Sequence, residues 1–245
     1  MLKPYIDLPQ CFRNEECMRY YNILEKKKAS LLLKRAFDIF VSLVLLILLL
    51  PILAIISILI KLDSKGPVIF RQKRVTTYNR DFYIYKFRTM VNNAEKLGSQ
   101  VTVSNDSRIT RVGKVLRKFR LDEIPQLLNI LKGDMSFVGT RPEVRRYVDG
   151  YEDKFYATLL MPAGVTSLAS ICYKDEERLL ECAEDVDSIY LSKILPDKME
   201  YNLSYIEKFS FIGDIKLMIM TVLAVCGMDF KEENENVKTE EMQNV

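Results

Sequence analysis

Twenty-two consecutive residues, from Ile39 to Ile60, carry no charge and are interrupted only by Ser42, Pro51 and Ser57. At a rise of about 1.5 Å per residue, a straight helix over this stretch is roughly 33 Å long, close to the ~30 Å hydrocarbon core of a bilayer. The polar lead that precedes the stretch is too long for a cleaved signal peptide. The sequence therefore predicts a helix embedded in a membrane.

Basic residues flank the apolar stretch on both sides. Before it come Lys26, Lys27, Lys28, Lys34 and Arg35, and after it come Lys61, Lys65, Arg71, Lys73 and Arg74. Such residues mark the cytoplasmic side of a membrane segment, so both ends are predicted to lie there. Pro51, near the middle, removes a backbone hydrogen bond and kinks a helix. These features favour a re-entrant helix that bends at Pro51 and leaves by the face it entered. A kinked helix that spans the bilayer is the alternative.

Two charged residues stand at the entrance to this segment, with Asp38 one turn after Arg35. An isolated carboxylate at the edge of a membrane is costly. We therefore expect Arg35 and Asp38 to pair with each other.

The next part of the chain is strongly basic, although the whole protein has a net charge of only +3. Residues 61–120 hold fifteen Lys and Arg against four Asp and Glu. Within them, Pro67–Arg74 and Asp81–Arg88 are rich in Val, Ile, Phe and Tyr and predict a β-hairpin. Arg111–Arg120 places apolar residues at helical spacing among basic ones, which is typical of a helix on an anionic membrane surface. A solvated surface helix is the alternative.

The remainder divides into apolar and acidic parts. Leu195–Cys226 is apolar at helical spacing, but its last run is too short for a second span and includes Lys216, which favours a packed or interfacial helix. Residues 175–187 hold seven acids and one base and predict a solvated loop or helix. The acidic tail, residues 231–245, is predicted to be disordered.

These segments predict a membrane-associated, predominantly α fold with a small β-hairpin. We divide the chain into a polar N-terminal segment (1–33), a re-entrant membrane helix (34–62), a catalytic domain on the cytoplasmic face (63–230) and the tail (231–245). Histidine is absent, which leaves any chemistry to carboxylates, Lys and Arg, hydroxyls or thiols. The five cysteines are odd in number and lack a Cys-x-x-Cys motif, as expected for reduced thiols facing the cytosol.

The residues best suited to chemistry are two adjacent acids, Asp122 and Glu123. Pro125 and Gly133 bracket a predicted helix, which places both acids at its N-terminus, where free N–H groups favour anions. A helix cap with an acidic first turn is one interpretation. The basic surroundings favour another, in which one carboxylate attacks phosphorus and the other holds Mg²⁺. An ionised carboxylate needs no general base for this attack.

At these residues the chain resembles the bacterial sugar transferase family, the monotopic polyprenyl-phosphate phosphoglycosyl transferases. The matching motifs run in order through most of the chain and include Lys34–Asp38, Gly66–Val75, Tyr85–Met90, Leu121–Asp134, Gly139–Glu143, Leu195–Lys198 and Tyr205–Lys216. The resemblance implies transfer of a sugar-1-phosphate from a UDP-sugar to undecaprenyl phosphate with release of UMP, as the first step of capsule, exopolysaccharide or other membrane-linked glycan synthesis. It also implies the re-entrant helix, at the cytoplasmic face of the inner (plasma) membrane.

The resemblance assigns roles residue by residue. It implies that Asp122 is the nucleophile and forms an aspartyl-phosphosugar intermediate, that Glu123 is associated with Mg²⁺, and that Arg141 contacts phosphate. Lys86 and Arg88 are further candidates for phosphate, with lipid headgroups as the alternative ligand. The expected partners are the UDP-sugar, undecaprenyl phosphate and the bilayer. A homodimer is left open, and nucleic acid is not expected.

The chain departs from the family pattern in three places. Leu50 stands where the family has Ser before the proline, Thr140 replaces the first proline of a Gly-Pro-Arg-Pro motif, and Ser167 replaces a glycine. The change at Thr140 predicts a looser loop around Arg141, and Ser167 lies in a region expected to approach the nucleotide or sugar. Two rival functions remain: a glycosyltransferase that moves the sugar alone, and a non-catalytic membrane scaffold whose basic face binds anionic lipid or polymer.

Overall fold

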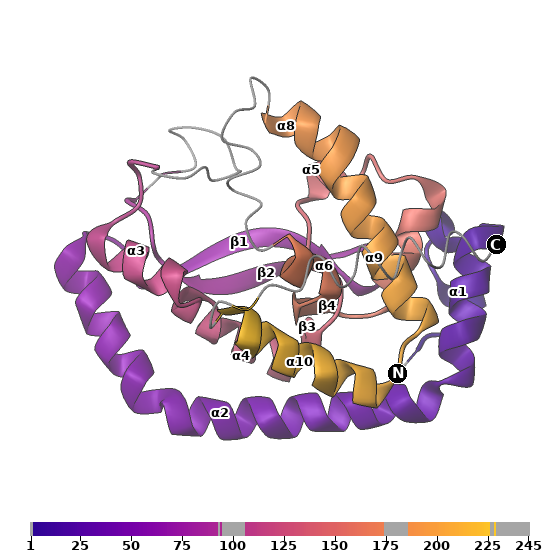
Figure 1. The fold of residues 1–245 in the computed structure, drawn as a ribbon, viewed down its shortest axis with the longest axis horizontal. Coiled ribbons are helices and arrows are strands. Elements are labelled where there is room, and N and C mark those ends of the chain that lie inside the picture. The colour runs from indigo at the N-terminus through magenta and orange to yellow at the C-terminus, as the bar shows by residue number, and fades with distance from the viewer. Residues whose placement is uncertain (1, 93, 95–105, 174–185, 226–227, 229–245) are drawn as a thin grey trace.

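A computed structural model describes residues 2–92, 94, 106–173, 186–225 and 228 of the chain (Figure 1). The predictions made for residues 175–185 and for the tail 231–245 lie outside these residues, as do Cys182 and Cys226. Cys11 and Cys17 are free thiols, as the sequence predicts.

The apolar stretch forms a single long helix, α2 (Lys28–Asp63), with Pro51 inside it. It is the one helix among the described residues that is long and apolar enough to cross a membrane, and only 11% of its most apolar window is buried. A core helix of a soluble protein would be mostly buried, so this exposure favours contact with lipid. Figure 1 shows that α2 bends and that the rest of the protein lies on its concave side. The proline is the expected cause of the bend.

The polar N-terminal segment is folded against the rest of the protein. Two short 3-10 helices, Tyr5–Asp7 and Gln10–Phe12, precede α1 (Glu15–Lys26). Asn14 caps α1 by accepting a hydrogen bond from the Cys17 backbone N–H at 2.7 Å. α1 packs beside α9 (Leu195–Glu207), and buried residues of both helices belong to one core.

The predicted β-hairpin is present. Strands β1 (Ile69–Thr76) and β2 (Arg80–Phe87) pair antiparallel in full register, from Ile69 opposite Phe87 to Thr76 opposite Arg80. The turn between them is tight, with Tyr78 and Asn79 at φ of 58° and 60°. The face of the hairpin that carries Phe82 and Ile84 packs on α4 (Leu127–Lys132). There the two side chains join Leu127 and Ile130 in one buried cluster.

A second, parallel pair of strands was not anticipated from the sequence. It consists of β3 (Met135–Val138) and β4 (Ala163–Thr166). Just beyond β3 the backbones of Gly139 and Gly164 lie in contact. The Gly164 N–H donates to the carbonyl of the next residue, Thr140, at 2.8 Å. Neither position has room for a side chain: a Cβ on Gly164 would lie 2.2 Å from the Gly139 carbonyl oxygen.

Replacing Gly164 with alanine is therefore expected to push this junction apart. The clash is with backbone, which cannot rotate away as a side chain can, so we expect a loss of about 1–3 kcal/mol in the free energy of unfolding. Thermal unfolding of the variant in detergent checks this. Gly150→Ala is the matched control, because its nearest contact is 3.6 Å. Equal unfolding temperatures for the two variants would contradict the prediction.

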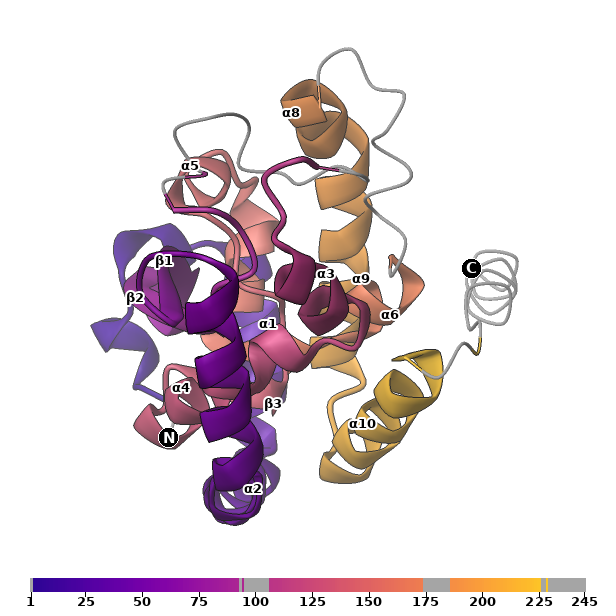
Figure 2. The ribbon, with the colours of Figure 1, turned by 90° about the vertical axis from the view of Figure 1, so that its left-hand side faces the viewer.

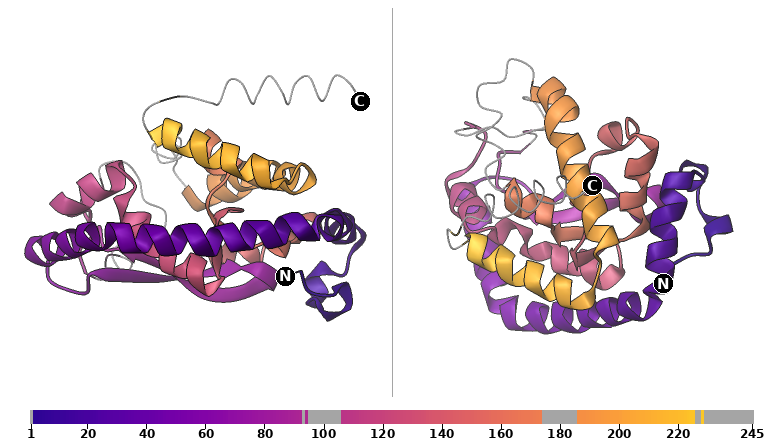
Figure 3. Two further views of the ribbon diagram at one scale, coloured as in Figure 1. Left: turned by 90° about the horizontal axis from the view of Figure 1, so that it is seen from below. Right: turned by 45° about the vertical axis from the view of Figure 1, so that its right-hand side comes forward.

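Short helices complete the structure around the two sheets. They are α3 (Arg111–Lys118), α5 (Arg145–Val148), the 3-10 helix Asp153–Leu160, α6 (Leu168–Cys172), α8 (Val186–Ile189), the π-helical turn Tyr190–Ile194, and α10 (Phe211–Val225). The apolar C-terminal run thus forms two helices, α9 and α10. Seen from below, α2 passes between the hairpin and α10 (Figure 3), and Figure 2 shows α10 at the side of the molecule. The predominantly helical fold with a small hairpin is confirmed in outline.

The expected pair between Arg35 and Asp38 is wrong. Arg35 instead donates to the Ile130 and Leu131 carbonyls at 2.6 and 3.0 Å, which lie in the last turn of α4. Asp38 is 3% exposed and accepts a hydrogen bond from the Phe137 backbone N–H at 3.3 Å. Both side chains bind backbone groups of other elements, and so they fasten α2 to the domain.

The predicted basic helix corresponds to α3, and Val115 and Phe119 leave about half of their side chains exposed, at 54% and 53%. An interfacial position predicts that a tryptophan at residue 119 meets lipid. Because the chain has no tryptophan, Phe119→Trp reports on that site alone. We expect quenching by brominated lipids in vesicles. Leu191→Trp, in the turn between α8 and α9 far from α2 (Figure 1), is the control that should stay unquenched.

Candidate active site

The two adjacent acids lie in a 3-10 turn that precedes α4. The turn, η5 (Leu121–Gln126), follows Arg120, whose φ of 56° reverses the chain after α3. α4 begins at Leu127, two residues later than the position of Pro125 suggested, and it ends at Gly133 with φ of 85°, as the sequence predicts. Asp122 and Glu123 therefore sit just before the α-helix, packed against β2.

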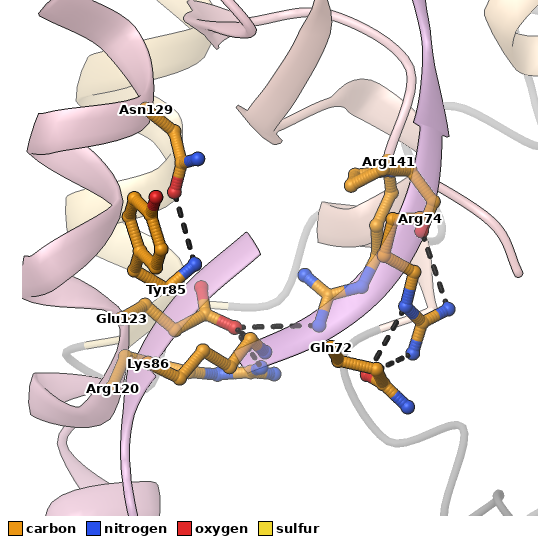
Figure 4. Close-up of polar contacts among 9 residues, drawn as sticks. Gln72, Arg74, Tyr85, Lys86, Arg120, Glu123, Asn129 and Arg141 are labelled. Carbon is orange, nitrogen blue, oxygen red and sulfur yellow. Dashed lines mark hydrogen bonds and ion pairs between the residues drawn. The ribbon is translucent and has the colours of Figure 1, made fainter. Parts of the chain in front are cut away.

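Glu123 is surrounded by cations. Its Oε1 lies 2.9 Å from Lys86 Nζ, 3.3 Å from Arg141 Nη2 and 4.0 Å from Arg120 Nη1 (Figure 4). Burial alone would raise the pKa of Glu123, but the three positive charges outweigh burial and hold it well below the usual range. Glu123 is therefore a fixed negative charge at any physiological pH.

Asp122 has the opposite environment. Its side chain is almost fully buried, and its Oδ1 has no hydrogen-bond partner among the described residues. Burial raises the pKa of Asp122, and the charge of Lys86 only partly opposes this. A carboxylate oxygen that lacks hydrogen bonds keeps its lone pairs available, as a nucleophile or a ligand requires.

The loop that carries Arg141 is held from three sides. The Glu143 carbonyl accepts from the Val75 N–H of β1 at 3.0 Å, and the Thr140 carbonyl accepts from the Gly164 N–H of β4. The Glu143 side chain accepts from the Tyr190 hydroxyl at 2.7 Å. These backbone hydrogen bonds and the buried Glu143 hold the loop at the point where Thr140 replaces the proline of the family motif.

The structure brings most of the predicted site residues together. Asp122, Glu123, Lys86 and Arg141 converge, whereas Arg88 does not join them. Its guanidinium instead binds the Pro67 carbonyl and the carbonyls of Ile60 and Ser64 at the end of α2. The phosphate role expected of Arg88 is therefore not supported, and the residue secures the end of the long helix.

Two residues that sequence reasoning did not single out also reach the site. Arg120 is the third cation near Glu123, and Arg74 of β1 lies beside Arg141 (Figure 4). Arg74 is held by Gln72 Oε1, at 2.7 and 3.1 Å, and by the Pro142 carbonyl at 3.3 Å. The available signal was the alternation of Gln72 and Arg74, which puts both side chains on one face of a strand.

The sequence model of the bacterial sugar transferase family matches residues 29–228. The chain belongs to the bacterial sugar transferase family. A UDP-N-acetylgalactosamine-undecaprenyl-phosphate N-acetylgalactosaminephosphotransferase of Aeromonas hydrophila is 39% identical over 197 residues, which are 79% of this chain and 43% of that protein.

Other members of the family differ in length. An exopolysaccharide production protein of Rhizobium leguminosarum bv. phaseoli is 39% identical over 79% of this chain and 95% of its own length. A UDP-glucose:undecaprenyl-phosphate glucose-1-phosphate transferase of Escherichia coli K12 is 37% identical over 78% of this chain and 39% of that protein. The chain thus spans less than half of two of these bacterial sugar transferases and nearly all of the third.

Proposed function

We propose that this bacterial sugar transferase moves a sugar-1-phosphate from a UDP-sugar to undecaprenyl phosphate and releases UMP, at the start of polysaccharide synthesis. The observation that carries the proposal is the pair of adjacent acids. Asp122 is buried, and its Oδ1 has no hydrogen bond to any residue that the structure describes, whereas Glu123 is surrounded by Lys86, Arg141 and Arg120. Cations beside a carboxylate suit a reaction in which one anion must attack another, because they offset the repulsion.

The proposed reaction has two steps. An oxygen of Asp122 attacks the phosphorus that bears the sugar, the bond from that phosphorus to the bridging oxygen breaks, and UMP leaves with the electron pair. An oxygen of the lipid phosphate then attacks the same phosphorus, breaks its bond to Asp122 and restores the carboxylate. Lys86 and Arg141 are placed to bind the phosphate oxygens during both steps.

Mg²⁺ fits the residues of this site. It prefers oxygen ligands and is commonly bound by one or two carboxylates together with substrate phosphates. Glu123, with the unpaired Oδ1 of Asp122 beside it, would hold the ion. When bound, Mg²⁺ supplies positive charge that neutralises phosphate oxygens. Because Lys86 and Arg141 already contact Glu123, we expect the ion to bind together with an anionic donor rather than before it.

The packing of the two ends of α2 supports the re-entrant arrangement. Leu24 of α1 precedes the helix and Val75 of β1 follows it, yet both belong to the same buried core. A helix that crossed the bilayer would leave these residues on opposite sides of the membrane. We therefore propose that α2 enters and leaves at the cytoplasmic face, with its bend at Pro51 in the lipid. Ser42 and Ser57 both bond helix carbonyls, so neither is placed to substitute at the bend for the serine missing at Leu50.

Identifying the nucleotide product tests the reaction class. Purified protein in detergent, given Mg²⁺, undecaprenyl phosphate and a panel of UDP-sugars, should release UMP with at least one sugar. Release of UDP would show that only the sugar moves and would reject the proposal in favour of an ordinary glycosyltransferase. A lack of turnover with every sugar, together with retained binding to anionic vesicles, would favour the scaffold.

A further inference from the structure

A small cavity adjoins the two carboxylates on the side of the Thr140–Glu143 loop. It has a volume of about 20 Å³ and is lined chiefly by Arg74, Lys86, Gln126, Arg141 and the backbone of Gly164. Lys86 and Arg141 also contact Glu123, so the cavity and the carboxylate pair share two walls. In Figure 4 the Arg141 guanidinium lies between Glu123 and Arg74, so Arg74 lies on the side of Arg141 that faces away from Glu123.

The charge around the cavity is strongly positive. Three of its lining residues are cations, and among the described residues that line it none is acidic. Burial lowers the pKa of Arg74, and the neighbouring charge of Arg141 lowers it further, while Glu143 partly opposes both. Glu143 is itself engaged by Tyr190 and lies 3.8 Å from Lys198 Nζ. A cluster of this kind is costly unless an anion neutralises it.

Arg74 is held in place by neutral groups. Its three hydrogen bonds go to the amide oxygen of Gln72 and to the Pro142 carbonyl, so they orient the guanidinium without neutralising its charge. An arginine that is fixed by a hydrogen bond from each of its three guanidinium nitrogens and remains charged is preorganised for an anion, because little side-chain entropy remains to be lost on binding.

We propose that Arg74 binds the phosphate that stays with the nucleotide, while Arg141 and Lys86 bind the phosphate that is transferred. This rests on the proposed function. Placing the sugar-bearing phosphorus at Asp122 puts the second phosphate of a pyrophosphate farther along the cavity, toward Arg74. The present cavity holds about one water, so the donor must displace the half-exposed Arg141 side chain. That movement breaks the 3.3 Å contact to Glu123, whose Oε1 then keeps its contact with Lys86 Nζ at 2.9 Å.

Binding of UMP, which carries only the nucleotide phosphate, tests this assignment. We expect Arg74→Gln to weaken UMP binding at least tenfold in calorimetric titration of the full-length protein in detergent. With a UDP-sugar that the wild type uses, the same variant should raise KM by a similar factor and change kcat less than threefold. Arg74→Lys should fall between the two, because it keeps the charge and loses the planar fork.

Arg71→Gln is the matched control, since it removes the same charge from an exposed position on the same strand and should leave UMP affinity within twofold of the wild type. Unchanged UMP affinity in Arg74→Gln would overturn the assignment. The assignment would also be overturned if Arg74→Gln and Arg74→Lys lost UMP affinity equally and unfolded at equally lowered temperatures. Arg74 would then only hold the loop. A wild type that binds no UMP and releases none would instead reject the proposed function.

Discussion

Asp122→Asn is expected to abolish sugar-phosphate transfer and, at the same time, to make the folded protein more stable. An amide cannot form the phosphoryl bond, and removal of a covalent nucleophile typically lowers kcat by roughly a thousandfold or more. The gain in stability follows because the native structure buries this carboxylate and leaves its Oδ1 without a hydrogen bond. Removing the buried charge should raise the free energy of unfolding by about 1 kcal/mol.

Two measurements check both halves of this prediction. With a labelled UDP-sugar and no lipid acceptor, the wild type should retain label on the protein and Asp122→Asn should retain none. Thermal unfolding in detergent should show a higher midpoint for the variant. Equal labelling of both proteins would exclude Asp122 as the nucleophile, and a lower midpoint would show that its carboxylate stabilises the fold.

Glu123→Gln is the matched control at the neighbouring position. The pKa of Glu123 lies well below its usual range because Lys86, Arg141 and Arg120 favour the charged form. Neutralising it leaves those cations without their shared partner, which should cost about 3 kcal/mol of stability. Two adjacent isosteric changes should thus shift stability in opposite directions, which a general disturbance of η5 would not produce.

The pH dependence of stability separates the same two acids. The pKa of Asp122 is higher in the folded than in the unfolded protein, so its destabilising effect is present at neutral pH and disappears as the pH falls through the folded value. The midpoint difference between Asp122→Asn and the wild type should therefore shrink on acidification. For Glu123 the sign is reversed: its contribution is present above the unfolded pKa and is lost as the pH falls toward the depressed folded value.

The parts of the fold that depend on local pattern could be predicted from the sequence. The alternating strands and the glycine at position 133 specify the hairpin and the end of α4 within a few residues. The apolar run specifies α2 and its end, but the helix begins at Lys28, six residues before the predicted start at residue 34. β3 and β4 were missed because each has only four residues, and they pair across a separation in sequence that leaves no local signal.

The sequence predicted which residue types form the site better than it predicted what each of these residues contacts. Four charged residues were predicted to belong to the site from their type and their basic neighbours, and they lie together in the structure: Asp122, Glu123, Lys86 and Arg141. Arg88 and Arg35 stood out for the same reason, yet both bind backbone carbonyls at helix ends. A sequence shows that an arginine is present, but whether its partner is a phosphate or the end of a helix depends on packing between distant segments.

Lys34→Met is expected to cause the largest loss of stability of any single change considered for this protein, about 3–5 kcal/mol. In the sequence Lys34 is one of the basic residues that mark the cytoplasmic side of the membrane segment. Instead it is buried, and its Nζ lies 2.5 Å from Asp214 Oδ2 of α10 and 2.8 Å from the Val138 carbonyl. The other oxygen of Asp214 accepts from the Tyr205 hydroxyl at 2.8 Å. Removing Lys34 leaves a buried carboxylate without its countercharge.

The matched control is a lysine on the same helix with an exposed partner. Lys28 pairs with Glu25 at 2.9 Å, but both side chains are about half exposed, so Lys28→Met should change stability by less than about 1 kcal/mol. Unfolding midpoints of the two variants in detergent give the comparison directly. Similar midpoints would contradict the prediction and would indicate that water reaches Asp214 in the native protein.

A second change should recover much of the loss. Asp214→Leu in the Lys34→Met background removes the unpaired carboxylate, and replacing both members of a buried ion pair with apolar groups is often nearly neutral for stability. Acidification should also recover part of the stability lost in Lys34→Met, because protonation removes the buried charge of Asp214. Burial already raises the pKa of Asp214, and the loss of Lys34 removes the charge that opposes this rise. The double variant could instead be no more stable than Lys34→Met. In that case Lys34 stabilises the protein through its hydrogen bond to the Val138 carbonyl. The contact of α2 with β3, and not its contact with α10, would then hold the membrane helix to the domain.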